Sequence, residues 1–500
     1  MVTARLIWLV LVFPAVAAGQ ARAVPQAWVQ EALQRAHATN EQIADSYHRA
    51  QSLAEIAEAE VAAGAGAAAR DSIRQARELS AGIKEEPLAS WIVHDVAMAQ
   101  VRAGEVAEAE RTVTAINDDR LQDAVLGAIV DAKRSAGDLS AALETARRMS
   151  IPANQGRSLR ELAILQANRG DIDGALATAR SIVHGGFNAL ALGDVAVVVA
   201  RVGDVSEARQ LAARIRDAPY RARALAEIAS VQADAGQLAS ALAIADEIED
   251  KVQRAAALGS IAAARAKSGD SRGAAELFTQ ALAAIGAARN AERKAAIYAD
   301  VARSQLVAAD RAGARESLLK ALESARLVRD ENVRVGLLSN IAPLQARAGD
   351  FAAAFATAAQ TSDPSLRPLL SRDLAVAQAE SGDIAGALGA ARALSDPQAS
   401  AAACFGVVRV LIPGQNAVAL REALEAAHAA LQNIRSAEVR AGFLGSLAVA
   451  HASAGDDDGA RSAFEEAMRV ADAANPGLQK ATAYARIADA VADRRLALPE

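Results

Sequence analysis

Aromatic side chains make up only 3% of this 500-residue chain, although 52% of its residues are hydrophobic. A core that is poor in aromatic residues has to be filled by small and aliphatic side chains. Roughly a quarter of the chain is alanine, far above ordinary usage. Because alanine is the best helix former and lets neighbouring helices approach closely, the composition predicts an all-α protein of many tightly packed helices.

Basic charge and cysteine are also scarce. The net charge is -6, so no excess of Lys and Arg is present to neutralise a phosphate backbone, and few aromatic rings are present to stack on bases. We therefore expect no nucleic-acid partner. The single cysteine, Cys404, cannot form an internal disulfide, and its apolar surroundings indicate a small core residue instead of a reactive thiol.

Long apolar runs are absent after the N-terminus. Residues 1–23 have the pattern of a secretory signal peptide, with Arg5, an apolar run over 6–12 and small residues after Pro14. Cleavage after Ala17 or after Ala23 satisfies the small-residue rule, and an uncleaved anchor is the alternative. We expect an exported, periplasmic protein with no membrane span once the signal is removed.

Catalytic motifs are missing as well. The six histidines show no metal-ligand spacing, and no phosphate-binding loop is present. Gly269, Ser271 and Gly273 match the Gly-x-Ser-x-Gly motif but lie on a turn between two expected helices, whereas the motif needs a strand before it. We therefore expect no catalytic residue, no metal, no cofactor and no enzymatic activity.

The sequence does contain a clear internal repeat. Twelve anchor residues follow one another at spacings of 40, then 33 five times, then 40, 40, 33, 32 and 41. They are Gly64, Gly104, Gly137, Gly170, Gly203, Gly236, Gly269, Ala309, Gly349, Gly382, Gly414 and Gly455, and most of them precede Asp, Glu or Gln. A fixed period of this size is typical of a solenoid of short repeated units.

Apolar positions keep a constant distance from each anchor. Alanine occurs five residues after all twelve anchors, as in Ala175 and Ala241, and an aliphatic residue occurs eight residues before every anchor except Gly414, where Gly406 stands. Glycine can end a helix in a left-handed conformation, and a following Asp can cap the next helix. Each unit is therefore predicted to be a helix A, a tight turn and a helix B.

These units resemble tetratricopeptide repeats, which combine small residues in helix A, a Gly-acidic turn and alanines in helix B. Two units follow that pattern closely, with Gly269, Asp270, Ala274, Phe278 and Ala281 in one and Gly455, Asp456, Ala460, Phe464 and Ala467 in the other. The main period of 33 and the absence of the usual Trp in helix A depart from the family, so a related helical-hairpin repeat stays open. The resemblance implies an α-solenoid, or superhelix, whose helices A line a concave groove.

The repeat also predicts the organisation of the chain. After the signal peptide at 1–23, residues 24–49 form an N-terminal capping helix, 50–478 form twelve TPR-like hairpins, and 479–500 form a C-terminal capping helix. Units spaced by 33 and by 40 should differ in the length of helix B, since seven residues are almost two helical turns. The apolar helix at 401–412 is expected to be buried.

An acidic residue recurs nine positions before the anchor, on the groove side of helix A. We call these residues the acidic row, and they are Glu55, Asp95, Glu161, Asp194, Glu227, Asp300 and Asp373. Such a row attracts a basic partner, unless each acid instead pairs with a nearby arginine. On one helix A, Trp91, His94 and Met98 form a second candidate anchor for a partner.

These observations favour a protein-binding scaffold or assembly factor that presents a concave groove to a protein or peptide, in particular a basic segment. Two alternatives stay open: a cell-envelope module that acts on lipid or polysaccharide, and an enzyme whose active-site residues are dispersed over the superhelix. The sequence does not indicate an oligomeric state.

Overall fold

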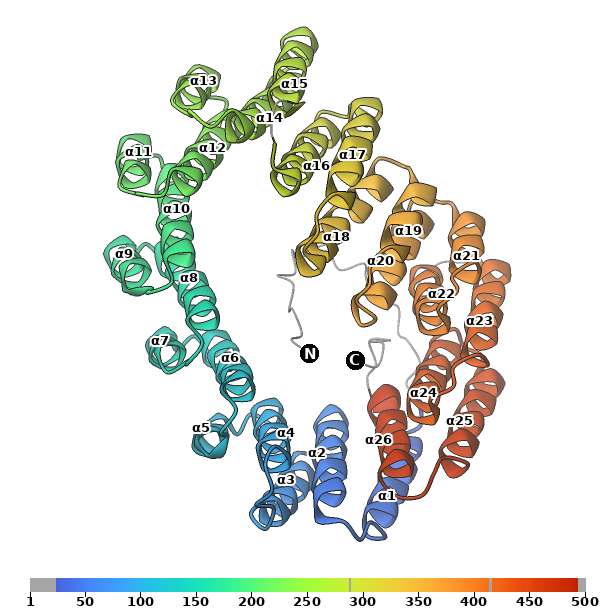
Figure 1. Cartoon of the computed structure of the whole chain (residues 1–500). Helices are drawn as coiled ribbons and strands as arrows, with labels where there is room; N and C mark the ends of the chain where they lie inside the picture. The colour runs from blue at the N-terminus through green and yellow to red at the C-terminus, as the bar shows by residue number, and fades with distance from the viewer. Residues whose placement is uncertain (1–23, 287–288, 413–415, 493–500) are drawn as a thin grey trace.

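The computed structural model describes residues 24–286, 289–412 and 416–492. Within these ranges the chain forms 26 α-helices, one 3-10 helix (Val113–Ala115) and no strand. The helices stand side by side in two concentric layers that curve into a ring (Figure 1). None of the described helices is long and apolar enough to cross a membrane.

The inner layer contains the even-numbered helices, which are the predicted helices A (Figure 1). They are α2 (Ser46–Ala62), α4 (Leu88–Arg102), α6 (Asp119–Ser135), α8 (Pro152–Asn168), α10 (Gly185–Arg201), α12 (Ala218–Asp234), α14 (Lys251–Lys267), α16 (Ala291–Val307), α18 (Glu331–Arg347), α20 (Leu366–Glu380), α22 (Pro397–Leu411), α24 (Ala437–Ser453) and α26 (Leu478–Ala492).

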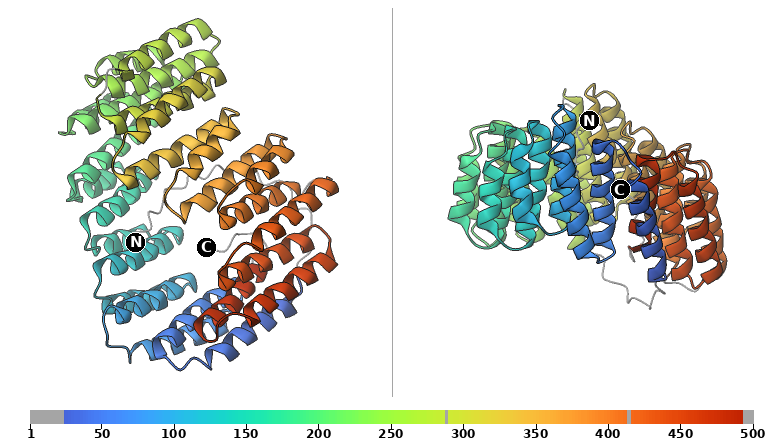
Figure 2. Two further views of the ribbon diagram at one scale, coloured as in Figure 1. Left: turned by 45° about the vertical axis from the view of Figure 1, so that its right-hand side comes forward. Right: turned by 90° about the horizontal axis from the view of Figure 1, so that it is seen from below.

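The outer layer contains the odd-numbered helices, which are the predicted helices B (Figure 1). They are α1 (Gln26–Asn40), α3 (Gly66–Ser80), α5 (Val106–Thr112), α7 (Leu139–Arg147), α9 (Ile172–Ser181), α11 (Val205–Ala213), α13 (Leu238–Asp246), α15 (Ser271–Gly286), α17 (Arg311–Arg326), α19 (Phe351–Ala359), α21 (Ile384–Arg392), α23 (Ala417–Leu431) and α25 (Asp457–Asp472). Two further views show that the helices of neighbouring hairpins run side by side (Figure 2).

The anchor residues make the predicted turns between the two layers. Every described glycine anchor has a positive φ, between 73° and 104°, and Ala309 has a φ of 62°. Where Asp follows the anchor, its carboxylate accepts a hydrogen bond of 2.8 to 3.2 Å from a backbone N–H in the first turn of the outer helix. These residues are Asp138, Asp171, Asp204, Asp270, Asp310, Asp350, Asp383 and Asp456.

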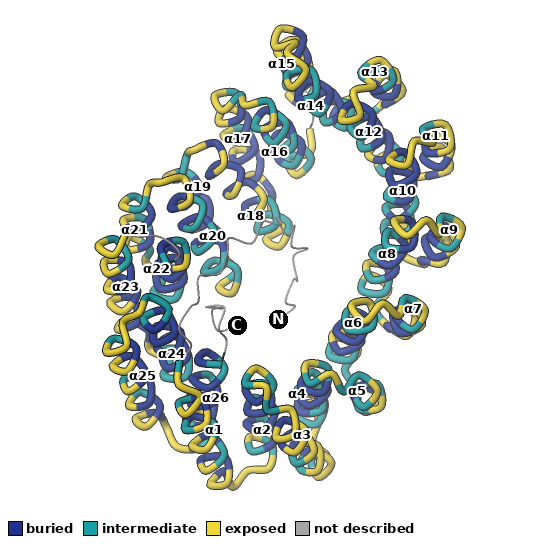
Figure 3. The backbone as a smooth tube through the Cα atoms, turned by 180° about the vertical axis from the view of Figure 1, so that it is seen from behind, coloured by how far each residue is buried: buried dark blue, intermediate teal, exposed yellow. Residues whose placement is uncertain are grey.

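The constant spacing of apolar residues from one repeat to the next produces the core between the layers. The aliphatic residues eight before the anchor are at most 2% exposed, and the alanines five after it are at most 3% exposed, apart from the unit at Gly414. In Figure 3 the buried part of each helix lies between the layers, while the outward side of the outer helices is exposed. Cys404, on the buried helix α22, is 0% exposed and confirms the core role predicted for it.

The register assigned at Gly414 was wrong by one residue. Gly414 itself lies outside the described residues, but the side chain that caps α23 is Asn416, so the anchor position falls at 415. Val407 then stands eight residues before the anchor and is 0% exposed. With this shift the spacings of 32 and 41 become 33 and 40, and Gly406 is no exception. The residue five after the anchor in this unit is then Leu420, so alanine occupies that position in eleven units and not in twelve.

The two lengths of helix B are confirmed. Units spaced by 33 have outer helices of seven to ten residues, such as α7 and α9, and units spaced by 40 have outer helices of 15 or 16 residues, such as α3 and α17. Short and long outer helices bury the same face, because the additional residues of the long helices extend them by about two whole turns.

The two half-units at the chain ends pack against each other. Helix α26, an inner helix without an outer helix after it, lies against α1, an outer helix without an inner helix before it (Figure 1). Their contact is nearly as extensive as that within covalent hairpins such as α2–α3. Each helix predicted as a cap therefore covers the apolar face of the other, and the array closes into a ring, which the repeat pattern did not predict.

Specific contacts support this closure. The rings of Trp28 on α1 and Phe464 on α25 stack with centroids 4.6 Å apart. Arg35 on α1 donates to Asp472 at 3.1 Å, and the Tyr484 hydroxyl on α26 donates to the same carboxylate. Burial and the bond to Asp472 raise the pKa of Tyr484 to about 12, so the hydroxyl keeps its proton at neutral pH. Residues 1–23, predicted as a signal peptide, and residues 493–500 lie outside the described residues.

The turn at Ala309 generates a stability prediction. A left-handed conformation costs a residue with a Cβ about 1–2 kcal/mol, and Ala309 is the one such non-glycine residue in the described chain. Replacing it with glycine removes this cost but loosens the unfolded chain, so Ala309→Gly should stabilise the protein by about 0.5–1 kcal/mol. Urea unfolding measures the change. The control Ala308→Gly, at φ -79° in the same turn, should destabilise instead.

Candidate interaction surface

The inner helices present one face to the interior of the ring. Successive residues of a helix are separated by about 100°, so positions 13, 9, 6 and 2 before the anchor lie opposite the buried stripe. The stripe faces the outer helices, and these positions therefore face the interior. On α4 they are Trp91, Asp95, Met98 and Arg102.

All members of the acidic row lie on this inner face, and each is partly buried. Most of them contact a basic side chain. Asp194 pairs with Arg160, Glu227 with Arg223, Asp300 with Arg303, Asp373 with Arg372, and Asp95 with His94. On α10, α12, α16 and α20 the row is therefore largely neutralised by arginines.

The ion pair between Arg160 and Asp194 has a structural role. It connects α8 to α10, and its side chains are only 18% and 14% exposed. The pair between Arg223 and Glu227, by contrast, lies within α12 and is 46% and 38% exposed. Glu161 forms no ion pair within 4 Å in the described structure, and burial raises its pKa, with Asp131 adding to the rise while nearby arginines oppose it.

Four acidic groups lie together where the ring closes. Glu55 and Glu58 on α2, Asp95 on α4 and Asp489 on α26 all lie on the inner face there, and we call these four residues the acidic patch. Arg102 pairs with Glu58, and Thr482 on α26 donates to Glu55 at 2.5 Å. The patch thus draws its carboxyl groups from both sides of the junction.

Burial and neighbouring charges shift the pKa values of Glu55 and Glu58. Burial raises the pKa of Glu58 to about 7; Arg102 opposes the rise, and Glu55, Asp95 and Asp489 add to it. Burial also raises the pKa of Glu55, although Thr482 and Arg486 oppose this. An additional cation placed here would favour the ionised form of both groups.

An exposed aromatic residue adjoins the patch. Trp91 is 46% exposed and lies one helical turn before Asp95 on the same face of α4. Met98 and His94 are partly buried beside it, and His94 contacts Asp95 at 3.0 Å. The sequence therefore identified Trp91, His94, Asp95, Met98 and Glu55, but it missed Glu58 and Asp489, because their position six residues before the anchor is acidic in few units.

Buried polar bridges between the layers were also missed. The residue four before the anchor hydrogen-bonds to the residue eight after it, at 2.7 Å in the pairs Gln166–Thr178 and Gln305–Ser317 and at 2.8 Å in Glu60–Ser72. A recurring polar residue inside an otherwise apolar stripe was the available signal. These bridges fix the two helices of a hairpin relative to each other.

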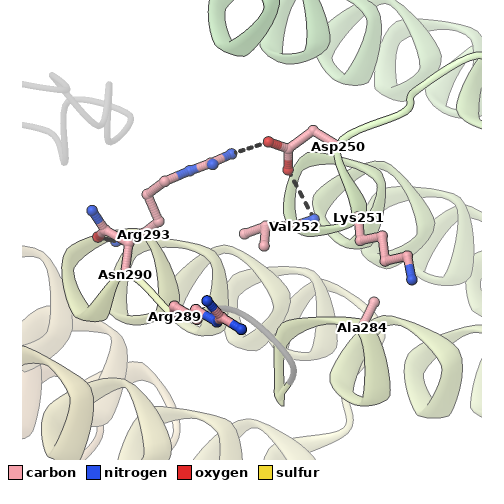
Figure 4. A pocket seen from close by; sticks show the side chains of 7 residues that line it. All are labelled: Asp250, Lys251, Val252, Ala284, Arg289, Asn290 and Arg293. Atoms are coloured by element: carbon pink, nitrogen blue, oxygen red, sulfur yellow. Dashed lines mark hydrogen bonds and ion pairs between the residues drawn. The ribbon is translucent and has the colours of Figure 1, made fainter.

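A pocket of about 260 Å³ lies between the starts of α14 and α16 (Figure 4). Lys251, Arg289 and Arg293 line it together with Asp250 and Asn290. Arg293 donates to Asp250 at 2.5 Å, and the carboxylate also accepts from the start of α14. Because three basic side chains line the pocket and it contains no residue of the acidic row, we do not place a basic partner there.

The fold and this surface define a class of protein: a tandem array of tetratricopeptide-like helical hairpins that exposes a continuous inner face. The sequence matches no known family profile and no curated protein.

Several solved structures are similar in fold. One is described as a circular tandem repeat protein with novel repeat topology and enhanced subunit contact surfaces (13% identity, 88% of this chain and 97% of that chain, TM-score 0.22). Others are Ton1535 from Thermococcus onnurineus NA1 (15%, 72% and 97%, 0.22) and the APC/C hetero-tetramer Cut9–Hcn1 (13%, 90% and 93%, 0.25). At these TM-scores the similarities carry no conclusion about partner or activity.

The Arg160–Asp194 pair generates a second stability prediction. Asp194→Asn leaves a mostly buried guanidinium without its counter-charge and should destabilise the protein by about 1–3 kcal/mol. Glu227→Gln removes an exposed pair and should cost less than about 0.5 kcal/mol. Thermal unfolding of both variants measures the difference. Equal melting of the two would show that Asp194 does not join α8 to α10.

The raised pKa of Glu58 generates a pH prediction. The group is neutral in both states below about pH 4.5, whereas above about pH 7 it is charged in both and the folded state carries the cost of burying that charge. Folding stability should therefore fall as the pH rises between these values. Glu58→Gln should reduce the fall, and Glu380→Gln, at an exposed inner position, should leave it unchanged. Urea titrations at pH 5 and pH 8 compare the variants.

Proposed function

We propose that this protein is an exported, non-enzymatic scaffold that binds a basic segment of a partner protein on the inner face of its ring. A helical repeat array suits protein–protein interaction in general, because its stacked units offer an extended surface that no compact domain of the same size provides. The acidic patch and Trp91 are the proposed contact point, and the signal-like residues 1–23 support export.

Exposed Trp91 is the single observation that carries the proposal. Tryptophan is enriched among the residues that dominate binding energy, and a large aromatic ring left 46% exposed on an inner face has no evident role in stability. Its ring can accept a Lys or Arg side chain through a cation–π contact, while Asp95 and Glu58 supply the counter-charge. A neutral or acidic segment lacks these contacts, and the nearby Arg102 already pairs with Glu58.

The rest of the acidic row supports the proposal less directly. Asp194, Glu227, Asp300 and Asp373 are paired with arginines, so their contribution is a mixed-charge surface. Such a surface admits a charged segment without strongly attracting it. Affinity should therefore concentrate at the acidic patch and weaken as salt screens it.

A peptide-binding measurement tests this proposal. A fluorescent Lys-rich peptide should bind the protein, and Trp91→Ala and Asp95→Asn should each weaken binding about tenfold at low salt. The control Glu227→Gln, in a pair away from the patch, should bind like the unmodified protein. A matched Glu-rich peptide should not bind.

The alternatives give different outcomes. Retention of the protein on lipid vesicles or on polysaccharide, with no binding of the Lys-rich peptide, would overturn the proposal in favour of an envelope module. Equal affinity of the Trp91→Ala variant and the unmodified protein would remove Trp91 as the contact point. Export is tested separately, by fractionating cells that express the chain with and without residues 1–23.

A further inference from the structure

We propose that the junction between α26 and the pair α1 and α2 is a gate, which opens to admit a partner segment into the ring and which a bound basic segment holds closed. The gate itself follows from the closure of the ring. The identity of the occupant rests on the proposed function above.

The junction differs from every other position in the ring by its connectivity. Each other pair of neighbouring hairpins is joined by the chain as well as by packing, so separated surfaces stay close and re-form quickly. Helices α26 and α1 belong to opposite ends of the chain and are held by contacts alone. In a repeat protein each unit contacts only its neighbours, and opening here therefore leaves the remaining interfaces intact.

The contacts across the junction combine a shared core with exposed polar pairs. Ala483, Tyr484 and Ile487 of α26 belong to one apolar cluster with Val29 and Ala36 of α1. The pair between Arg35 and Asp472, in contrast, has side chains 43% and 49% exposed, and exposed ion pairs of this kind contribute little to stability. The core makes the closed state favourable, and the exposed polar rim permits water to enter on opening.

The acidic patch couples this junction to an occupant. Glu55 and Glu58 stand on one side of the contact, and Asp489 and Arg486 stand on the other. Asp489 adds to the cost of ionising Glu58, whereas Arg486 favours the ionised form of Glu55. A Lys or Arg side chain of the occupant, placed between Glu58 and Asp489, can interact with both carboxyl groups only when the junction is closed. By linkage, a ligand that binds the closed state more tightly than the open state shifts the equilibrium between these states toward the closed ring, by a factor set by the ratio of the two affinities.

Topology supplies the reason for a gate. A closed ring can be entered by the free end of a chain, but a segment between two folded domains cannot pass through it. Such a segment can thread the ring only if the ring opens somewhere, and the junction is the place where opening breaks no turn.

Hydrogen exchange tests the gate without any partner. Backbone amides of α26 and α1 should exchange at least tenfold faster than those of α12 and α14, on the far side of the ring. In the double variant Arg35→Cys, Asp472→Cys, linking the two introduced cysteines with a short bifunctional maleimide should abolish this difference in exchange rate. Native Cys404 is 0% exposed and burial raises its pKa to about 11, so it should not react.

A matched cross-link serves as the control. Arg392 on α21 and Glu422 on α23 form a pair at 3.0 Å between consecutive outer helices, with exposures of 48% and 53%, as Arg35 and Asp472 do at 3.1 Å. Joining Arg392→Cys to Glu422→Cys should leave the exchange of α26 and α1 unchanged. Equal protection of α26 and α12 in the unmodified protein would overturn the gate, whatever the ring binds.

Two peptide probes then test its use. One is the Lys-rich peptide with free ends, and the other carries a fluorescent protein domain at each end. If the junction cross-link is made before mixing, binding of the two-domain probe should weaken at least tenfold and binding of the free peptide should be unchanged. The control cross-link should change the binding of neither probe. If the junction cross-link is made after mixing, the two-domain probe should stay bound in high salt.

The outcomes separate the two proposals. If the free peptide does not bind to the unmodified protein, the proposed function fails, while the exchange measurement still decides the gate. If the two-domain probe binds the cross-linked and unmodified proteins equally, the partner does not enter through the junction and the gate proposal is overturned.

Discussion

The close approach of inner and outer helices at one small residue is the constraint on which the whole ring depends. The alanine five residues after the anchor is almost completely buried in nearly every unit, and a larger side chain there would force the two helices of the hairpin apart. Because the same spacing is repeated round the chain, each hairpin presents nearly the same shape to the next. A constant rotation from unit to unit then generates the curvature, and enough units return the chain to its starting point.

Local patterns predicted most of this architecture from the sequence. The Gly–Asp turns, the buried aliphatic residues such as Leu162 and the two lengths of helix B all follow from constraints within one unit, which a repeated sequence displays many times. The register assigned at Gly414 was wrong because it relied on the glycine alone. Glycine marks the turn in most units, but capping by Asn416 determines where α23 begins, and a glycine one residue away carries no such information.

Closure of the ring could not be predicted in this way. It depends on the small rotation between successive hairpins, summed over the whole chain, and no single unit reveals that sum. Some signal was present, because Val29 and Ala36 match an outer helix and Tyr484 and Ile487 match an inner one, but half-units at both ends are equally typical of an open solenoid with two caps. The candidate surface shows a similar limit. The acidic row was visible, and the partners of Glu227 and Asp300 lie three or four residues away on the same helix. The pairing of Asp194 with Arg160, in contrast, joins two helices and depends on how they are placed.

The hairpin formed by α26 and α1 bears on where along the ring the chain could begin and end. In this hairpin α26 packs on α1 as an inner helix packs on its outer helix elsewhere, so the end of α26 and the start of α1 take the places of the two helix ends at one more interhelical turn. The ring therefore has no structural first or last repeat. A circularly permuted chain, joined from Ala492 to Gln26 through a short Gly–Asp linker and opened instead at the turn after Gly236, contains the same set of hairpins and has every requirement for the same fold.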